Sequence, residues 1–388
     1  MKILFICQEL KLNVPRSIRV SELISRGTTN KVTVLYFDDH AYENNDGQFR
    51  KVSLTFGNFM KFVFFRDFYK KRTNYSVINK LVGAVNLFYD RFNLLDNWKL
   101  SHSKIVEYVN YTDFDAISIS IAPFSNFLLV RKLRKAGYKG QIVLDIGDPL
   151  SYNSALNISR DGVLKKTELS SIQLANKLIV TNSGTQKLYR DDFNFSKPIE
   201  VLPNGFTVNE LFYPPKITFS FNQKLELVYA GAVYQTLRPI DPLLAAIKEC
   251  SEDVEIVVIA AHKPNIEADN IKWHGRMSSA ELIDYYRKAN ILIYIDNITG
   301  IQTSSKIFEL LALGKPILFL YSFESENYLF AKNFPWVIFI NNDEESIKAF
   351  FQSADTIKPL ELIPDYTKLK TFEWDNMAKK YYEFLGSS

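Results

Sequence analysis

Two apolar patterns alternate along most of this chain. Short unbroken apolar runs are typical of strands buried on both faces, and apolar positions three or four residues apart are typical of helices. Their alternation predicts parallel α/β sheets. In the N-terminal half we expect strands at 2–7, 32–37, 116–121, 141–144 and 178–181, and helices at 17–26 and 164–176.

The alternation is interrupted once, which predicts two domains. Pro214, Pro215 and the polar stretch up to Lys224 have the composition of a linker. A second strand–helix series begins at Leu225, and a last amphipathic helix begins near residue 371. A length of 388 residues also suits two domains. We therefore expect an N-terminal domain at 1–213, a C-terminal domain at 214–370 and a terminal helix at 371–388.

The segment 303–320 combines a capped helix with charged residues. Three hydroxyl residues, Thr303, Ser304 and Ser305, suit an N-cap, and Gly314 stands where a C′ glycine belongs. Apolar residues cover nearly the whole circumference of the predicted helix of about three turns, so we expect it to be buried. A capped helix start with free N–H groups is a natural seat for phosphate.

Lys306 and Glu309 share one face of that helix. Lys306 would add positive charge at the phosphate seat, and Glu309 would accept hydrogen bonds from sugar or ribose hydroxyls. The alternative is an ordinary ion pair on the helix surface, worth only ~0.2–0.5 kcal/mol. The apolar residues around the two side chains leave little surface for such a solvated pair.

This segment, S-K-I-F-E-L-L-A-L-G-K-P-I, resembles the donor-binding helix of retaining, two-domain (GT-B) glycosyltransferases of the family-four type (glycosyl transferases group 1). Three further segments resemble the same family in the right order, at 201–214, 227–247 and 271–295. The resemblance implies two Rossmann-like domains facing a central cleft, with the last helix returning to the first domain. It also implies that the helix start binds the diphosphate of a nucleotide sugar and that Glu309 holds the ribose.

The resemblance implies further donor contacts before this helix. Gly231 ends the first strand of the second domain, and Arg238 follows where the family often has a basic residue for the diphosphate. The alternative for Arg238 is a surface arginine at a helix start, which the helix dipole disfavours. Gly275 and Arg276 stand where the family surrounds the nucleotide base, although Arg276 suits a plain turn equally well.

The sequence departs from the family pattern at three places. The first of two glutamates eight residues apart would fall at Ile301, which puts the contact to the donor sugar in doubt. The arginine often found after the turn glycine is Ala232, and Lys306 would supply the missing charge. A histidine often found in the first domain's cleft is absent after the strand at 116–121.

Acceptor-binding candidates lie in the first domain. Asp148, in the segment 144–150, follows a strand at the edge where α/β sheets place their ligands, and it could hold or deprotonate an acceptor hydroxyl. A turn aspartate before Pro149 is an equally ordinary choice. Arg16 and Arg19 begin a helix after the first strand and would meet an anionic acceptor such as a lipid diphosphate; a solvated helix face is the alternative.

The segment 56–72 mixes aromatic and basic residues. Phe59, Phe62, Phe65 and Tyr69 fall close to one helical face, and Lys70 is one of several nearby cations. A basic aromatic helix can lie in a membrane interface and bind anionic lipid. A core helix that ends in a charged turn is the alternative.

Composition excludes several other classes of protein. A net charge of +4 is too small to imply a nucleic-acid partner. Two distant cysteines argue against disulfides or a zinc site and suit a reducing cytoplasm. The N-terminal stretch has too few apolar residues for a signal peptide. No metal-ligand spacing occurs, and we expect neither a metal nor a cofactor.

Three functional hypotheses remain. The first is a cytoplasmic retaining glycosyltransferase that moves a sugar from a nucleotide-sugar donor to a glycan or lipid-linked acceptor in surface polysaccharide or glycoconjugate synthesis, with peripheral contact to an anionic membrane. The second is an inactive homologue that acts as a binding subunit. The third, a dinucleotide-dependent oxidoreductase, lacks its G-x-G-x-x-G loop, because the first strand is followed by no glycine and Gly231 stands alone.

Overall fold

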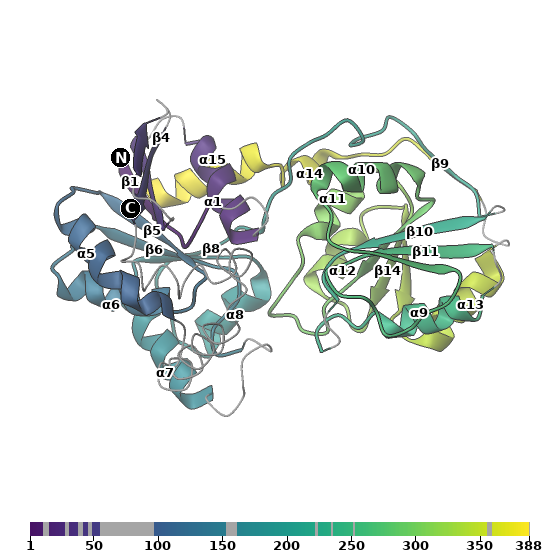
Figure 1. Ribbon diagram of the computed structural model, residues 1–388, viewed down its shortest axis with the longest axis horizontal. Coiled ribbons are helices and arrows are strands. Elements are labelled where there is room, and N and C mark those ends of the chain that lie inside the picture. The colour runs from purple at the N-terminus through teal and green to yellow at the C-terminus, as the bar shows by residue number, and fades with distance from the viewer. Residues whose placement is uncertain are drawn as a thin grey trace, which may run out of the picture. The chain divides into compact units, whose positions relative to one another are not determined.

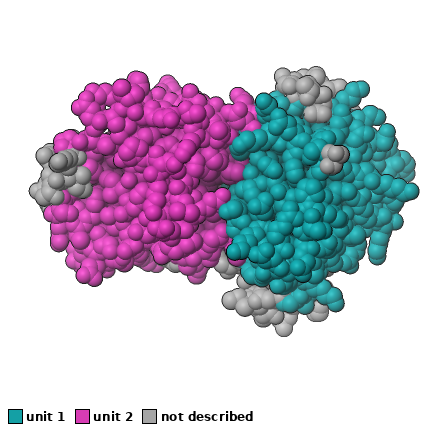
Figure 2. Space-filling view, turned by 180° about the vertical axis from the view of Figure 1, so that it is seen from behind, with its two compact units in different colours: residues 1–202, 377–388 teal, residues 203–376 magenta. Residues whose placement is uncertain are grey.

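The computed structural model describes residues 1–10, 15–27, 31–37, 42–45, 49–54, 97–152, 161–221, 224–233, 236–250, 253–354 and 359–387. The chain divides into two compact units (Figures 1 and 2). Unit 1 contains residues 1–202 and 377–388, and unit 2 contains residues 203–376. Each unit is built on its own mainly parallel sheet.

The described part of unit 1 contains an eight-stranded sheet in the order β3-β4-β2-β1-β5-β6-β7-β8. All neighbouring strands are parallel except β3 and β4. The central strands are almost fully buried, which explains why they are mostly apolar, and Ser118 and Ser120 of β5 are buried as well. The strands are β1 (Lys2–Ile6), β2 (Lys31–Phe37), β3 (Tyr42–Asn45), β4 (Phe49–Leu54), β5 (Ala116–Ile121), β6 (Gln141–Ile146), β7 (Lys177–Val180) and β8 (Ile199–Val201).

Helices cover both faces of this sheet. Figure 1 shows α1 and α15 on one face, and α5 and α6 on the other. The described helices of unit 1 are α1 (Pro15–Ser25), the 3-10 helix η1 (Asn97–Ser101), α5 (His102–Asn110), α6 (Asn126–Lys135), α7 (Asp161–Ile172), α8 (Ser183–Asp191) and α15 (Trp374–Gly386). The strands and helices predicted for this half are confirmed, with ends that differ by a few residues.

The last helix, α15, belongs to unit 1 from residue 377 onward. The Tyr381 hydroxyl lies 2.5 Å from the hydroxyl of Ser118 on β5, and Tyr382 donates to the carbonyl of Leu23 on α1 at 3.0 Å. The buried Lys177 donates to the carbonyl of Phe384 at 2.7 Å, near the helix end where a cation is favourable. The predicted return of the final helix to the first domain is confirmed.

The residues of unit 2 that the structure describes form a six-stranded parallel sheet in the order β12-β11-β10-β13-β14-β15 and a separate antiparallel pair, β16-β9. The strands are β9 (Ile217–Phe219), β10 (Leu225–Ala230), β11 (Val254–Ile259), β12 (Ile271–His274), β13 (Ile291–Ile295), β14 (Ile317–Tyr321), β15 (Val337–Asn341) and β16 (Leu360–Leu362). The helices are α9 (Asp241–Lys248), α10 (Ser279–Lys288), α11 (Lys306–Ala312), α12 (Glu326–Ala331), α13 (Glu344–Ser353) and α14 (Thr367–Lys370).

Alternate residues of β13 point into two separate cores. Leu292 and Tyr294 belong to the core beneath α11, whereas Ile293 belongs to the core beneath α9 and α13. Phe206 and Phe212 belong to the first of these cores, so the segment 203–213 packs within unit 2. The boundary we expected at 213/214 therefore lies inside unit 2, because these two aromatic side chains are buried there.

Gly314 ends the turn after α11 with a positive φ of 59°, as expected for a C′ glycine. A Cβ at this position would lie 2.4 Å from Cγ of Pro214 and 2.4 Å from the hydroxyl of Tyr366. Close packing therefore excludes a side chain here, in addition to the backbone conformation.

We expect Gly314→Ala to lower the free energy of unfolding by about 2–3 kcal/mol, since it adds left-handed strain and a steric clash. Urea unfolding followed by circular dichroism measures the loss. Gly162→Ala is the matched control, because Gly162 lies exposed in α7 with no atom near its added Cβ. Equal stability of the two variants would contradict the packing account.

Candidate functional site

The strand order of unit 2 reverses between β10 and β13, which are parallel neighbours. Parallel α/β sheets place ligands outside the carboxyl ends of their strands at such a switch point. Gly231 directly follows β10, and Asp296 and Asn297 directly follow β13. The switch point therefore lies beside two of the segments that the sequence analysis selected.

Arg238 is tied to this edge through Asn297. Its Nε and Nη2 atoms donate to Oδ1 of Asn297 at 3.1 and 2.8 Å. The amide of Asn297 donates in turn to the carbonyl of Gln302 at 2.7 Å, while Asn297 itself is buried. Arg238 remains partly exposed. The structure thus brings Arg238 to the segment that leads into α11.

Helix α11 differs from its expected form. It has seven residues rather than about three turns, and Ser305 at its N-cap position makes no side-chain capping bond. The expectation that the hydroxyl residues cap this helix is wrong for Ser305. Its backbone has near-helical angles (φ −70°, ψ −3°), whereas a residue whose side chain caps a helix usually has extended angles. Thr303, Ser304 and Ser305 all remain partly exposed.

Lys306 and Glu309 form a half-buried ion pair. The distance between Nζ and Oε2 is 2.8 Å, and each side chain is 27% exposed. The Lys306 ammonium also lies 5.3 Å from the ring centre of Tyr286. Burial lowers the pKa of Lys306, but the charge of Glu309 and the neighbouring Tyr286 outweigh it, so the pKa is raised overall. The ion pair exists, but it is not the fully solvated kind.

A buried polar network lies directly beneath this segment. Tyr294, near the end of β13, donates toward the Ser304 carbonyl and toward Oδ1 of Asp296, both at 3.2 Å. Asn327 on α12 donates to the Tyr294 hydroxyl at 2.7 Å and to the Ser304 carbonyl at 3.1 Å. Ser325 donates to the other oxygen of Asp296. All these side chains except that of Ser304 are buried.

Burial raises the pKa of the Asp296 carboxyl, and hydrogen bonds from Ser325, Asn297 and Tyr294 offset only part of that effect. The sequence analysis missed this network. An aspartate and an asparagine directly after an apolar strand were the available signal, because such a strand end faces the ligand edge of a parallel sheet.

The remaining donor candidates lie elsewhere on the same edge. Gly231 lies beside the side chain of Tyr229, whose hydroxyl donates to the Ala232 carbonyl at 2.8 Å. Gly275 and Arg276 follow β12, on the far side of β11 from β10, and both are exposed. The structure places all three after strands of unit 2 that end at one edge.

In unit 1, Arg16 and Arg19 bind the same carboxylate. Arg16 Nη1 lies 3.0 Å from Oδ1 of Asp145, and Arg19 Nε lies 2.8 Å from Oδ2. A Cβ on Gly147 would lie 2.0 Å from Nη2 of Arg16, so a larger residue at position 147 would displace this guanidinium. Burial raises the pKa of Asp145, but the two arginine charges outweigh it and lower the pKa overall.

The solvated helix face that we considered for Arg19 is wrong, because its side chain is only 1% exposed. Its bond to Asp145 and its position 5.9 Å from the Tyr381 ring centre explain the burial. Arg19 therefore holds the end of β6 against α15 and offers little surface to a ligand, whereas Arg16 is slightly more open.

Asp148 is exposed, in the loop that follows β6. The buried Glu168 of α7 fixes this loop, since it accepts bonds from the backbone N–H groups of Leu150 and Ser151, both at 2.9 Å. The Tyr189 hydroxyl also donates to Glu168 at 2.6 Å. Asp148 is therefore exposed on a loop whose backbone is held by Glu168.

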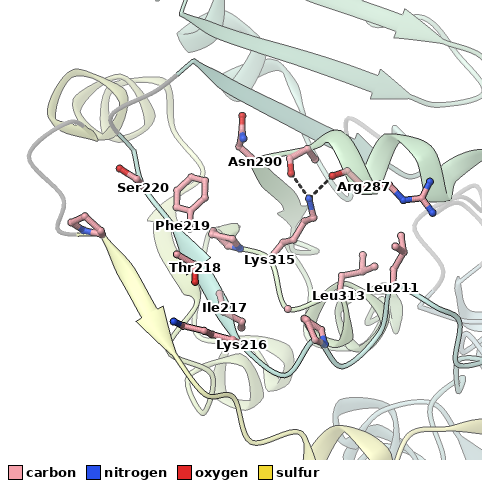
Figure 3. Close-up of a pocket in the computed structure, with 15 residues that line it drawn as sticks. Leu211, Lys216, Ile217, Thr218, Phe219, Ser220, Arg287, Asn290, Leu313 and Lys315 are labelled. Atoms are coloured by element: carbon pink, nitrogen blue, oxygen red, sulfur yellow. Dashed lines mark hydrogen bonds between the residues drawn. The ribbon is translucent and has the colours of Figure 1, made fainter.

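Unit 2 has a cavity of 550 Å³ whose lining includes none of the predicted site residues. Figure 3 shows the side chains that line it. The cavity lies where β13 and β14 begin, at the edge opposite Arg238, and Asn290 and Pro316 form part of its wall. Lys315 spans it by donating to the carbonyls of Arg287 and Ala289 at 2.8 and 2.6 Å. These bonds satisfy the end of α10, which favours a structural role for Lys315.

No family model matches the sequence, and no curated protein matches it. Solved structures match over the whole chain. A sucrose-phosphate synthase from Thermosynechococcus elongatus matches with a TM-score of 0.68 at 14% identity, over 99% of this chain and 98% of that one. The chain has the GT-B fold.

Two further solved structures agree. A structure described as trehalose-6-phosphate from E. coli bound with UDP-2-fluoro glucose matches with a TM-score of 0.66 at 10% identity, over 99% of both chains. A UDP-forming α,α-trehalose-phosphate synthase from Burkholderia xenovorans in complex with glucose-6-phosphate matches with a TM-score of 0.67 at 8% identity, over 100% of both chains. The predicted α/β fold of two Rossmann-like domains is confirmed. At these identities the likeness establishes the fold, and the roles of single residues stay predictions.

The segment 56–72, which we selected for membrane contact, lies outside the described residues. Among the residues that are described, no helix is both long enough and apolar enough to cross a membrane.

Proposed function

We propose that this protein is a retaining glycosyltransferase that uses a nucleoside-diphosphate sugar as its donor. The observation that carries the proposal is the group of Arg238, Lys306 and Glu309 on unit 2, in segments that border or follow the switch-point strands of a GT-B fold. The matched structures include UDP-forming synthases, one of them with glucose-6-phosphate bound. Two cations and one carboxylate at such an edge suit a diphosphate that is joined to a ribose.

In the proposed reaction, the bond between the sugar C1 and the diphosphate oxygen breaks as an acceptor oxygen bonds to C1. The diphosphate leaves with the electron pair and gains negative charge. Arg238 and Lys306 would stabilise that charge without a metal ion, and Glu309 would accept hydrogen bonds from the ribose hydroxyls. The acceptor hydroxyl proton would pass to a base, and Asp148 of unit 1 is our candidate.

The acceptor in this proposal is a glycan or a lipid-linked glycan, used in surface polysaccharide or glycoconjugate synthesis on the cytoplasmic side of a membrane. The basic aromatic segment 56–72 supports it, since such segments bind anionic lipid surfaces. Arg16, whose guanidinium lies against Gly147 and pairs with Asp145, adds positive charge for a phosphorylated acceptor.

A thermal-shift screen against UDP-, GDP-, dTDP- and CMP-sugars tests the donor class, because a ligand that binds only the folded state raises Tm. A concentration-dependent rise with one donor, followed by release of the nucleoside diphosphate when acceptor is added, would establish the activity. Binding without turnover on any acceptor would indicate an inactive homologue that serves as a binding subunit.

Glu309→Gln should weaken binding of the donor found in that screen by about tenfold and leave Tm within about 2 °C of the native value. Glutamine keeps the size and one acceptor oxygen but loses the charge that strengthens bonds to hydroxyl groups. Calorimetric titration of both proteins measures the difference. If Glu309 served only as a structural partner of Lys306, Tm would fall while donor affinity stayed unchanged.

A further inference from the structure

We infer that Tyr294, Asn297 and Asn327 are positioning residues that set the backbone orientation of the segment 302–305 for the donor diphosphate. This inference rests on the proposed function, since it concerns the same donor site. None of the three side chains needs to touch the donor. Each acts on the backbone that carries Thr303, Ser305 and Lys306.

Two backbone carbonyls of this segment are held from below. The Gln302 carbonyl accepts from the Asn297 amide at 2.7 Å. The Ser304 carbonyl accepts from the Asn327 amide at 3.1 Å and lies 3.2 Å from the Tyr294 hydroxyl. All three donors are buried, so the two carbonyls point into the protein.

Because the peptide group is planar, these hydrogen bonds also set the direction of the N–H group of the next residue. In a trans peptide the N–H of the next residue points opposite to the carbonyl. With the carbonyls of Gln302 and Ser304 directed inward, the N–H groups of Thr303 and Ser305 must point outward. Among the described residues, neither N–H donates to a backbone carbonyl. Two backbone N–H groups that point out of the protein at this edge can donate to phosphate oxygens.

Asn327 is the central member of this network. Its amide has two N–H donors, and both are used, one for the Tyr294 hydroxyl and one for the Ser304 carbonyl. The Tyr294 hydroxyl has a single proton, which it can give either to Ser304 or to Asp296. Asn327 therefore keeps the Ser304 carbonyl satisfied whichever partner Tyr294 chooses.

Asn297 joins this arrangement to Arg238. Its amide nitrogen holds the Gln302 carbonyl, and its oxygen accepts from two nitrogens of Arg238. One buried side chain thus holds both the guanidinium of Arg238 and the peptide group that carries the Thr303 N–H. A shift of Asn297 would move both sets of phosphate donors, and small displacements of positioned groups are costly to catalysis.

The test compares Tyr294→Phe and Asn327→Leu with Tyr321→Phe as the matched control. Tyr321 ends the neighbouring strand β14, and its ring packs against Tyr328 and Phe339. Tyr294→Phe keeps the ring and removes only the hydroxyl, so it provides a folded variant even if Asn327→Leu unfolds. Hydrogen–deuterium exchange of the peptides that cover 300–308 should be faster in both variants and unchanged in the control.

Calorimetric titration with UDP, GDP, dTDP and CMP follows, using the full-length proteins. For the nucleotide that the native protein binds, Kd should rise by about tenfold in Tyr294→Phe and by more in Asn327→Leu. Each variant loses a bond to the Ser304 carbonyl, and the bond from Asn327 is the one that does not depend on where Tyr294 gives its proton. In turnover assays the donor KM should rise more than the acceptor KM, which a general loss of stability would not produce.

Two results would overturn the inference in distinguishable ways. If the native protein binds one nucleotide and both variants bind it equally well with unchanged exchange at 300–308, the inference alone fails. If the native protein binds none of the four nucleotides, the proposed function fails and the inference falls with it.

Discussion

Replacing Arg238 or Lys306 with alanine should reduce turnover by about 100-fold and weaken binding of the free nucleoside diphosphate. Each removes a charge-assisted contact, typically worth ~1.5–3 kcal/mol, and the charge on the diphosphate grows as it departs. Loss of a donor aimed at developing charge typically costs ~10²–10³ in kcat. Single-turnover kinetics at saturating donor, together with calorimetric titration of the nucleotide, measure both effects.

Arg287→Ala is the matched control for this prediction. Arg287 is also an arginine of unit 2, but it lines the cavity at the opposite edge of the sheet and pairs with Glu210 and Asp284. It should keep native turnover. Native nucleotide affinity in both the Arg238 and the Lys306 variants would remove these residues from the donor site.

Lowering the pH from 7 to 5 should cost the protein about 2 kcal/mol of unfolding free energy through His102 alone, rising to about 4–5 kcal/mol below pH 3. His102 begins α5 and is fully buried. Burial, together with the charges of Lys132 and Lys99, lowers its pKa from the ordinary 6.5 to about 3, although Asn126 opposes the shift slightly.

The direction of the effect follows from proton binding. Between pH 6.5 and about pH 3 the unfolded chain binds a proton at this histidine and the folded chain does not. Stability therefore falls as the pH falls through this window. Urea midpoints of unit 1, recorded between pH 7 and pH 5, measure the slope.

His102→Gln should flatten that slope whatever its effect on the absolute stability, because glutamine does not titrate. His262→Gln is the control, since His262 is exposed and lies in unit 2. An unchanged slope in His102→Gln would show that other groups dominate the acid response.

The sequence predicted the strands and helices well where local pattern decides them. The strand at 116–121 and the start of the second series at Leu225 agree with β5 and β10, because strands buried between helices in a parallel sheet are mostly apolar. Gly314 was also predictable, since a left-handed C′ position strongly favours glycine.

Predictions for single polar side chains were less successful. A triplet of hydroxyl residues before α11 suggested a cap, yet Ser305 lies in helical geometry and makes no capping bond. Arg19 suggested either a ligand contact or a solvated face, yet it is buried against Asp145. In both cases the outcome depends on backbone angles or on partners that are distant in sequence.

The sequence by itself determined the two-domain α/β architecture, because hydrophobic periodicity acts between neighbours along the chain. Arg238, Lys306 and Glu309 were selected with the help of the resemblance to a family, and their roles stay predictions. Only the tertiary structure showed that Tyr294, Ser304 and Asn327 form one network, and that Arg16 and Arg19 share Asp145. Strand order decides which distant side chains meet, and a buried polar group is stable only beside the partner that this order supplies.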